Sequence, residues 1–264
     1  MARPQIVVNV AAALQRRGTP TDTGVAFLVY AGATGPSDPI QCYSKADALA
    51  AAVPETQATW VGDCLNQGAP SVWVLRAAAA DASAVTEAEW TTALSKIGAG
   101  FGPGQVFIPG VSTAAAHAAL LDHADLFTRC VLLDVAGDAT ATAIATTAAG
   151  LAAAPGSERA TILAGWPTVT GPAGTTRDIP GSVVTAGLVA RGDAAAGHAN
   201  NAPAGSQGRG AGFVAGAVAI STAFTDAEHD TLHDAGVSVF RTINNVVQAL
   251  RLGVALRRAH LPAG

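Results

Sequence analysis

The sequence predicts an α/β fold in which a mainly parallel sheet is flanked by helices. Apolar segments of strand length alternate with helical segments of about 10–15 residues, and this alternation is typical of βαβ units. Half of the 264 residues are hydrophobic and 13% are charged, so the chain can bury a full core. Two further strand-like segments, one at each end of the chain, stand apart from this pattern and are interpreted as arms.

The body of the predicted fold begins at residue 24. Apolar runs at 24–30 and 71–76 indicate two buried strands. Between them, Ser44 is suited to cap a short helix, and residues 56–66 show a helical pattern that ends before Gly68. This part of the chain therefore predicts strands separated by helices.

Two capping boxes mark further helix starts. Thr86 is followed three residues later by Glu89, and Thr225 is followed in the same way by Glu228. In such a box, each side chain satisfies a free N–H group of the other residue at the helix start. Apolar residues on one helical face and glycine stops complete the pattern, namely Trp90, Leu94, Ile97, Gly98 and Gly236.

The second half of the chain alternates most plainly between strands and helices. Three helices are expected, from Ser112 or Thr113 to about Phe127, from Asp138 to near Pro155, and from Pro180 to Ala190. Strands are expected at 105–108, 130–135, 161–165, 217–221 and 237–241. Strands separated by helices of this length favour a parallel sheet.

The arms are interpreted from apolar patterns at the two ends of the chain. A short strand pattern near the N-terminus is followed by the breaker-rich stretch 16–20, and residues 250–256 alternate with a period of two. Such segments can pair with the open sheet edge of a neighbouring molecule or within their own sheet, and the residues leave both open. The candidate interface residues are Ile6, Val7, Val8, Val10, Leu250, Leu252, Val254 and Leu256.

Charge and cysteine content argue against several function classes. The formal net charge is −4 and the pI is about 5.8, so no nucleic-acid partner is expected. Cys42, Cys64 and Cys130 are odd in number and widely spaced, which favours a reducing compartment over a disulfide framework. The apolar run 211–220 is shorter than the roughly 20 residues that span a bilayer, so no direct membrane insertion is expected.

Two histidine pairs are candidates for metal chemistry. His229 and His233 are four residues apart and are similar to the HExxH zinc motif, but Asp230 replaces the glutamate and no third ligand follows. A zinc-dependent hydrolase is therefore a distant alternative, and surface histidines on a polar helix are the favoured interpretation. His117 and His123 are six residues apart, on different faces of a helix, and are expected to be solvated at the helix end.

The glycine-rich segment and the triad-like residues each lack part of the motif that a functional site of their kind requires. The segment 98–104 lacks one glycine of the dinucleotide fingerprint and precedes a strand instead of a helix. Ser112, His117 and Asp134 supply the residue types of a catalytic triad, but the GxSxG turn is absent. We therefore expect no catalytic, cofactor-binding or metal-binding residues, and a protein that is not an enzyme.

Several segments, in a fixed order along the chain, resemble one protein family. They are 24–27 (GVAF), 72–76 (VWVLR), 106–113 (VFIPGVST), 130–134 (CVLLD), 164–167 (AGWP), 186–193 (AGLVARGD) and 225–228 (TDAE). Each is similar to a motif of the contractile tail sheath proteins of phages and related injection machines. The shared order extends over roughly residues 24–258.

The resemblance implies a subtilisin-like α/β core without protease activity and without a cofactor. It implies subunits that stack as hexameric rings around a tail tube and contract to drive that tube through a target envelope. The implied partners are other copies of the chain, the tail tube protein, and the baseplate and tail terminator proteins. The implied location is the tail of a virion, after assembly in the host cytoplasm.

Four regions are expected on this basis. They are an N-terminal arm at 1–20, an N-terminal α/β part of the core at 21–100, a subtilisin-like sheath core at 101–242 and a C-terminal strand or arm at 243–264. Sheath proteins usually continue into a further C-terminal domain that contacts the tube, and the resemblance implies that this domain is lacking here. Either the chain is a minimal sheath protein whose final strand at 250–256 replaces the exchanged arm that usually ends that domain, or it is a sheath-like relative that does not contract. The second explanation gives the alternative function, a non-contracting sheath-like cap or baseplate ring protein.

Overall fold

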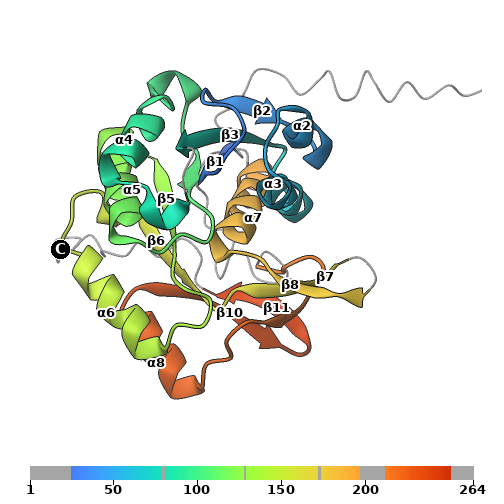
Figure 1. Ribbon diagram of the computed structural model, residues 1–264. Coiled ribbons are helices and arrows are strands. Elements are labelled where there is room, and N and C mark those ends of the chain that lie inside the picture. The colour runs from blue at the N-terminus through green and yellow to red at the C-terminus, as the bar shows by residue number, and fades with distance from the viewer. Residues whose placement is uncertain (1–24, 79–80, 128, 172–173, 197–211, 251–264) are drawn as a thin grey trace, which may run out of the picture.

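The computed structural model describes residues 25–78, 81–127, 129–171, 174–196 and 212–250. They form an α/β fold on an eight-stranded sheet, with a three-stranded sheet beside it (Figure 1). The order of the large sheet is β11 (Val246–Leu250), β10 (Val237–Ile243), β6 (Ala160–Ala164), β5 (Cys130–Asp134), β4 (Gln105–Phe107), β1 (Val25–Ala31), β3 (Ser71–Ala78) and β2 (Ile40–Cys42). The six inner strands are parallel, and the two edge strands run antiparallel to their neighbours, so the predicted mainly parallel sheet is confirmed.

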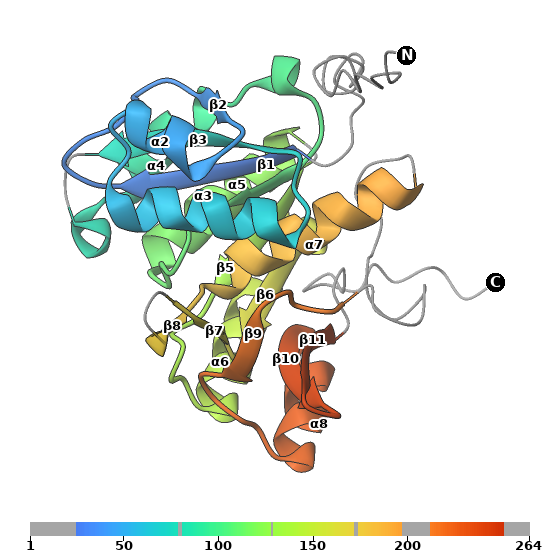
Figure 2. The ribbon, with the colours of Figure 1, turned by 90° about the vertical axis from the view of Figure 1, so that its right-hand side faces the viewer.

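Helices cover both faces of the large sheet (Figures 1 and 2). One face carries α2 (Lys45–Ala50), α3 (Glu55–Gln67) and α7 (Gly181–Ala196); the other carries α4 (Glu87–Ser95), α5 (Ala114–Phe127), α6 (Ala141–Leu151) and α8 (Asp226–Asp234). Along β1, Ala26 and Leu28 face the first helix layer, whereas Phe27 and Val29 face the second. Because both faces are covered, the inner strands are apolar almost throughout. None of the helices in the described ranges is long and apolar enough to cross a bilayer.

Local capping interactions account for the starts of several helices. In both predicted boxes the threonine hydroxyl accepts from the backbone N–H of the glutamate, and the glutamate carboxylate accepts from the backbone N–H of the threonine. The short helix α2 is capped by Ser44, as predicted. However, α6 begins after Thr140 and not at Asp138, because the Thr140 hydroxyl accepts the backbone N–H of Ala143.

The structure contains short strands that the sequence pattern does not reveal. β2, β7 (Pro167–Thr170) and β8 (Thr176–Asp178) are three or four residues long. Their positions depend on antiparallel partners, and β9 (Ala217–Ile220) joins β7 and β8 in the small sheet. Strands of this length contain too few residues for a periodic pattern to identify them.

The last described strand lies before the segment that was predicted as the C-terminal strand. β11 starts at Val246, whereas the expected strand covers 250–256, of which 251–256 lie outside the described residues. β10 and β11 form a hairpin whose two turn residues, Asn244 and Asn245, have φ of 50° and 61°. Two consecutive positive φ values fit a type I′ turn, which asparagine tolerates well.

The two expected parts of the core contribute to one sheet. β1, from the region 21–100, pairs with β3 on one side and with β4, from the region 101–242, on the other. The sheet therefore continues across residue 100 without a break.

Helices α3 and α7 approach each other closely at Gly187. A Cβ atom on Gly187 would lie 2.5 Å from the carbonyl oxygen of Cys64 and 2.5 Å from Cβ of Gln67. Both contacts are shorter than van der Waals separation, and one of them is with backbone. By contrast, a Cβ on Gly150 in α6 would meet nothing within 4 Å.

We expect Gly187→Ala to destabilise the fold by about 1–3 kcal/mol, because α3 and α7 would have to move apart. The matched control, Gly150→Ala, should stabilise it by up to about 1 kcal/mol, because alanine is the better helix former in open space. Urea unfolding of the two variants and the unmodified chain measures both effects. Equal stability changes for the two variants would contradict this account of the α3–α7 contact.

Candidate functional site

The side chain of Arg129, just before β5, is buried at 1% exposure and is held mainly by backbone carbonyls. Its Nε donates to the oxygen of Gly102 at 2.9 Å, Nη2 donates to Gly98 at 2.7 Å, and Nη1 donates to Ile97. The ring of Phe27 lies against the guanidinium, with 4.9 Å between Cζ and the ring centroid. The glycine-rich segment 98–104 therefore presents carbonyl oxygens to a buried cation of its own chain. The sequence does not reveal this role, because nothing local to Arg129 marks it.

His123 is buried beside this arginine. Its Nε2 lies 3.1 Å from Nη1 of Arg129, and because a guanidinium can only donate, Nε2 is the acceptor. Burial, and secondly the charge of Arg129, lower the pKa of His123 to about 4. The expectation that His117 and His123 are solvated at a helix end is wrong, because both rings face the core and are 2–3% exposed.

The carboxylate of Asp134, at the carboxyl end of β5, is fully enclosed. It accepts hydrogen bonds from the backbone N–H of Gly110 at 2.8 Å, the backbone N–H of Ser182 at 2.8 Å, and the Ser182 hydroxyl. Burial raises the pKa of Asp134 to about 6, and these three donors oppose that rise. The role of Ser182 is not visible in the sequence, because its partner Asp134 lies 48 residues away along the chain.

The triad-like residues do not form a catalytic relay. Nε2 of His117 lies 3.0 Å from the backbone carbonyl oxygen of Asp134, and the Asp134 carboxylate is engaged elsewhere. Ser112 is exposed, whereas Ser182, whose hydroxyl does meet Asp134, is fully buried. A nucleophile needs both a base and access to substrate, and neither serine has both.

His229 and His233 lie on α8, next to Phe224. The interpretation of both as surface histidines is wrong for His229, which is 4% exposed and packs edge-on against Phe224. The two imidazole centroids are 6.1 Å apart. Within the described ranges, no group of three or more His, Cys, Asp or Glu side chains is arranged to hold a metal ion.

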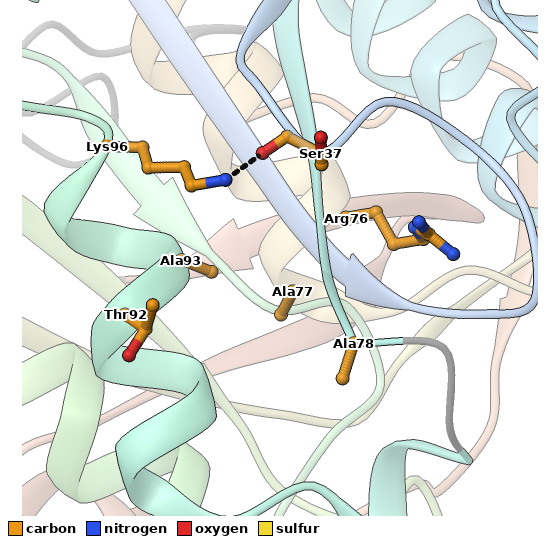
Figure 3. A pocket seen from close by; sticks show the side chains of 7 residues that line it. All are labelled: Ser37, Arg76, Ala77, Ala78, Thr92, Ala93 and Lys96. Atoms are coloured by element: carbon orange, nitrogen blue, oxygen red, sulfur yellow. Dashed lines mark hydrogen bonds between the residues drawn. The ribbon is translucent and has the colours of Figure 1, made fainter.

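A hollow of about 160 Å³ lies between the end of β3 and α4 (Figure 3). Its floor includes Ala77, Ala78 and Ala93, and Nζ of Lys96 donates to the carbonyl oxygen of Ser37 across it at 2.6 Å. The side chain of Arg76 points away from Lys96 in Figure 3.

The predicted interface residues fall largely outside the described part of the chain. Ile6, Val7, Val8, Val10, Leu252, Val254 and Leu256 lie outside it, and Leu250 ends β11. Part of the outer side of β11 is covered by residues 212–214, since Val214 N–H donates to Val247 and Ala249 N–H donates to Gly212. At the opposite edge, no strand of the described residues pairs with the outer side of β2.

No family model matches the sequence, and no curated protein matches it. Solved structures do match. The helical sheath of the anti-feeding prophage in its contracted state aligns with a TM-score of 0.63 and 16% identity, over 95% of this chain and 67% of that one. A sheath tail protein from Listeria innocua aligns with a TM-score of 0.56 and 12% identity, over 94% of this chain and 72% of that one.

The chain has the fold of a contractile-sheath protein. A sheath tail protein from Desulfitobacterium hafniense gives the same result, with a TM-score of 0.59 and 11% identity over 95% of this chain and 75% of that one. The resemblance found in the sequence motifs thus extends to the sheath fold as a whole. At these identities the likeness establishes the fold, and the role of the chain is argued separately below.

The buried His123 predicts acid sensitivity. The ring is neutral in the folded protein down to about pH 4, whereas an unfolded histidine gains its proton near pH 6.5. The free energy of unfolding should therefore decrease as the pH falls from about 6.5 to about 4. His123→Gln, which keeps an acceptor for Arg129, should flatten this decrease in urea unfolding measured across that range.

Asp134 should affect the pH dependence of stability in the opposite direction from His123. Its raised pKa means that the folded state binds the proton more tightly, so its contribution to stability decreases as the pH rises from about 4 to about 6. Asp134→Asn should therefore steepen the gain in stability with pH. If both variants keep the slope of the unmodified chain, these two buried groups do not govern its pH dependence.

Proposed function

We propose that this chain is a structural subunit of a contractile phage-type sheath. In this proposal, copies assemble into stacked hexameric rings around a tail tube and contract to drive the tube through a target envelope. The observation that carries it is the likeness to a helical sheath over 95% of this chain. The ordered sheath-like motifs of the sequence support the same role.

The arms are the proposed links between copies. A strand at 6–10 that joins a neighbour's sheet would form about five ladder hydrogen bonds, at roughly 0.5–1.5 kcal/mol each. The outer side of β2 is an unpaired edge in the described part of the chain; with three residues, β2 could pair with part of such a strand and form correspondingly fewer of these bonds. Contacts of this kind are heterologous, so they propagate into rings or helices and do not end at a dimer.

Contraction in this proposal needs no nucleotide. Assembly would hold the lattice in an extended state, and better contacts between cores in the contracted state would drive the change. The proposed partners are further copies, the tail tube protein, and the baseplate and tail terminator proteins. The proposed location is the tail of a virion, following assembly in the host cytoplasm.

A non-contracting ring protein of a cap or baseplate is the second candidate. The observation that favours it is a match to the contracted baseplate of the anti-feeding prophage, with a TM-score of 0.61 and 12% identity over 94% of this chain. Negative-stain electron microscopy across a concentration series separates the two functions. Tubes that lengthen with concentration support the sheath, closed rings at every concentration support the cap, and monomers at high concentration contradict both for the isolated chain.

Proline at position 8 should prevent tube formation without unfolding the core. Val8→Pro removes a backbone donor from the middle of the proposed arm strand, whereas the matched control Val8→Thr keeps that donor and a β-branched side chain. We expect tubes from Val8→Thr, no tubes from Val8→Pro or from deletion of residues 1–18, and the same thermal unfolding midpoint for all dissociated chains. Normal tubes from Val8→Pro would contradict strand donation by this arm.

A further inference from the structure

A short segment lies along the outer side of β11, the last strand of the large sheet (Figure 2). It covers residues 212–216, directly before β9, and we call it the strap. Phe213 of the strap forms an isolated antiparallel bridge with Gln248 of β11. The strap therefore takes the place of a neighbouring strand, although its pairing with β11 is only one bridge long.

The strap occupies half of the backbone groups that β11 offers on its outer side. In an antiparallel ladder, every second residue turns its N–H and C=O groups away from the partner strand. Within β11 these residues are Val247 and Ala249, so four groups point away from β10. The C=O of Val247 accepts from the N–H of Val214 at 3.0 Å, and the N–H of Ala249 donates to Gly212 at 2.9 Å.

Side chains of α3 and α7 hold the strap in place. Gln67, at the end of α3 and 2% exposed, donates from Nε2 to the carbonyl oxygen of Ala215 at 3.0 Å, and its Oε1 accepts the Ala215 N–H at 2.9 Å. Arg191 of α7 donates to the carbonyl oxygen of Phe213 at 3.0 Å. Val214, between these two contacts, is fully buried in the core on the α3 and α7 side of the sheet.

The edge beneath the strap is complementary to itself. Open strand edges readily pair with the same edge of another molecule. If two copies of β11 pair antiparallel about a twofold axis at Gln248, Val247 of each copy lies opposite Ala249 of the other, and the outward groups form four hydrogen bonds. The strap makes two such bonds, with Phe213 in the position that Gln248 of a second copy would take.

We propose that the strap is a guard that keeps β11 from pairing with β11 of a second copy. The dimer that it prevents is isologous and therefore closed, so it cannot extend into a ring or a tube. A covering loop is one of the ways in which natural proteins protect a sheet edge. The proposal concerns the single chain in solution and goes beyond the proposed sheath function.

Two variants that loosen the strap test the proposal. Gln67→Leu keeps the size of the side chain but removes both hydrogen bonds to Ala215. Gly212→Ala adds a Cβ that would lie 2.5 Å from the carbonyl oxygen of Ala249, so the strap must move away from β11. The matched control, Gln41→Leu, makes the same substitution on β2 and removes a side-chain hydrogen bond at the opposite edge of the sheet.

We expect both strap variants to dimerise and the unmodified chain and Gln41→Leu to remain monomeric in the soluble fraction. If Gln67→Leu makes release of the strap about tenfold easier, the association constant should rise about a hundredfold, because both copies must release their straps. Sedimentation velocity across a concentration series measures this rise. Hydrogen exchange at the Ala249 amide, measured in dilute monomer, should be faster in both strap variants.

Faster exchange at Ala249 without dimers would overturn the proposal, because the edge would then be open and still not pair. Exchange that neither variant changes would overturn it as well, because Gln67 and Gly212 would then not hold the strap on β11. Since Gly212→Ala acts outside α3, it keeps the test decisive if Gln67→Leu fails to fold.

Charges at Gln248 test the register of the dimer. In the Gln67→Leu background, Gln248→Lys or Gln248→Glu places two like charges directly opposite each other, which destabilises the pairing of the strands. Each double variant alone should stay monomeric at concentrations at which Gln67→Leu dimerises, and an equimolar mixture should form heterodimers. Dimers that form equally well from each double variant alone would reveal a different interface and reject the pairing of β11 with β11.

The proposal and the sheath function can fail separately. Dimers of the strap variants support the guard even if no chain, unmodified or variant, forms tubes. Tubes from the unmodified chain together with monomeric strap variants support the sheath function and reject the guard. If both hold, the strap variants should need a higher concentration than the unmodified chain to form tubes, because closed dimers withdraw subunits from assembly.

Discussion

The hydrogen bonds of the buried Asp134 carboxylate hold three parts of the fold together. A carboxylate away from water is unfavourable unless donors compensate it. Here the donors come from Gly110, after β4, and from Ser182, in the first turn of α7. The end of β5, the β4–α5 loop and the start of α7 are therefore held at one point, and the packing of α7 on α3 depends on that start.

A second buried charge lies at the other end of the same strand. Arg129 precedes β5 and is satisfied by carbonyl oxygens of the segment around Gly98, with His123 as a neutral neighbour. Neither buried charge relies on an ion pair: Arg129 is compensated chiefly by loop carbonyls, whereas Asp134 accepts from one loop N–H, that of Gly110, and from the N–H and hydroxyl of Ser182. This arrangement gives the two loops defined shapes at opposite ends of the sheet, and it accounts for the glycine-rich segment without a bound phosphate.

The sequence reveals those features whose causes are local. The boxes at Thr86 and Thr225 depend on residues three positions apart, and both form as predicted. The burial of His123 and His229 depends instead on which helix face meets the sheet, and in helices rich in alanine the apolar pattern hardly distinguishes the faces. Short strands such as β7 are set by distant partners. The Asn244–Asn245 turn was a local signal, and recognising it would have placed β11 correctly.

The close approach of α3 and α7 at Gly187 also has a mechanical consequence. Interlocked helices slide past each other only if they first separate, because the backbone of one occupies the groove of the other. A load applied to the core would thus be transmitted through this pair with little shear. In a tube that shortens, deformation would concentrate in the joints between subunits, and the core would behave as a stiff block that changes orientation without changing shape.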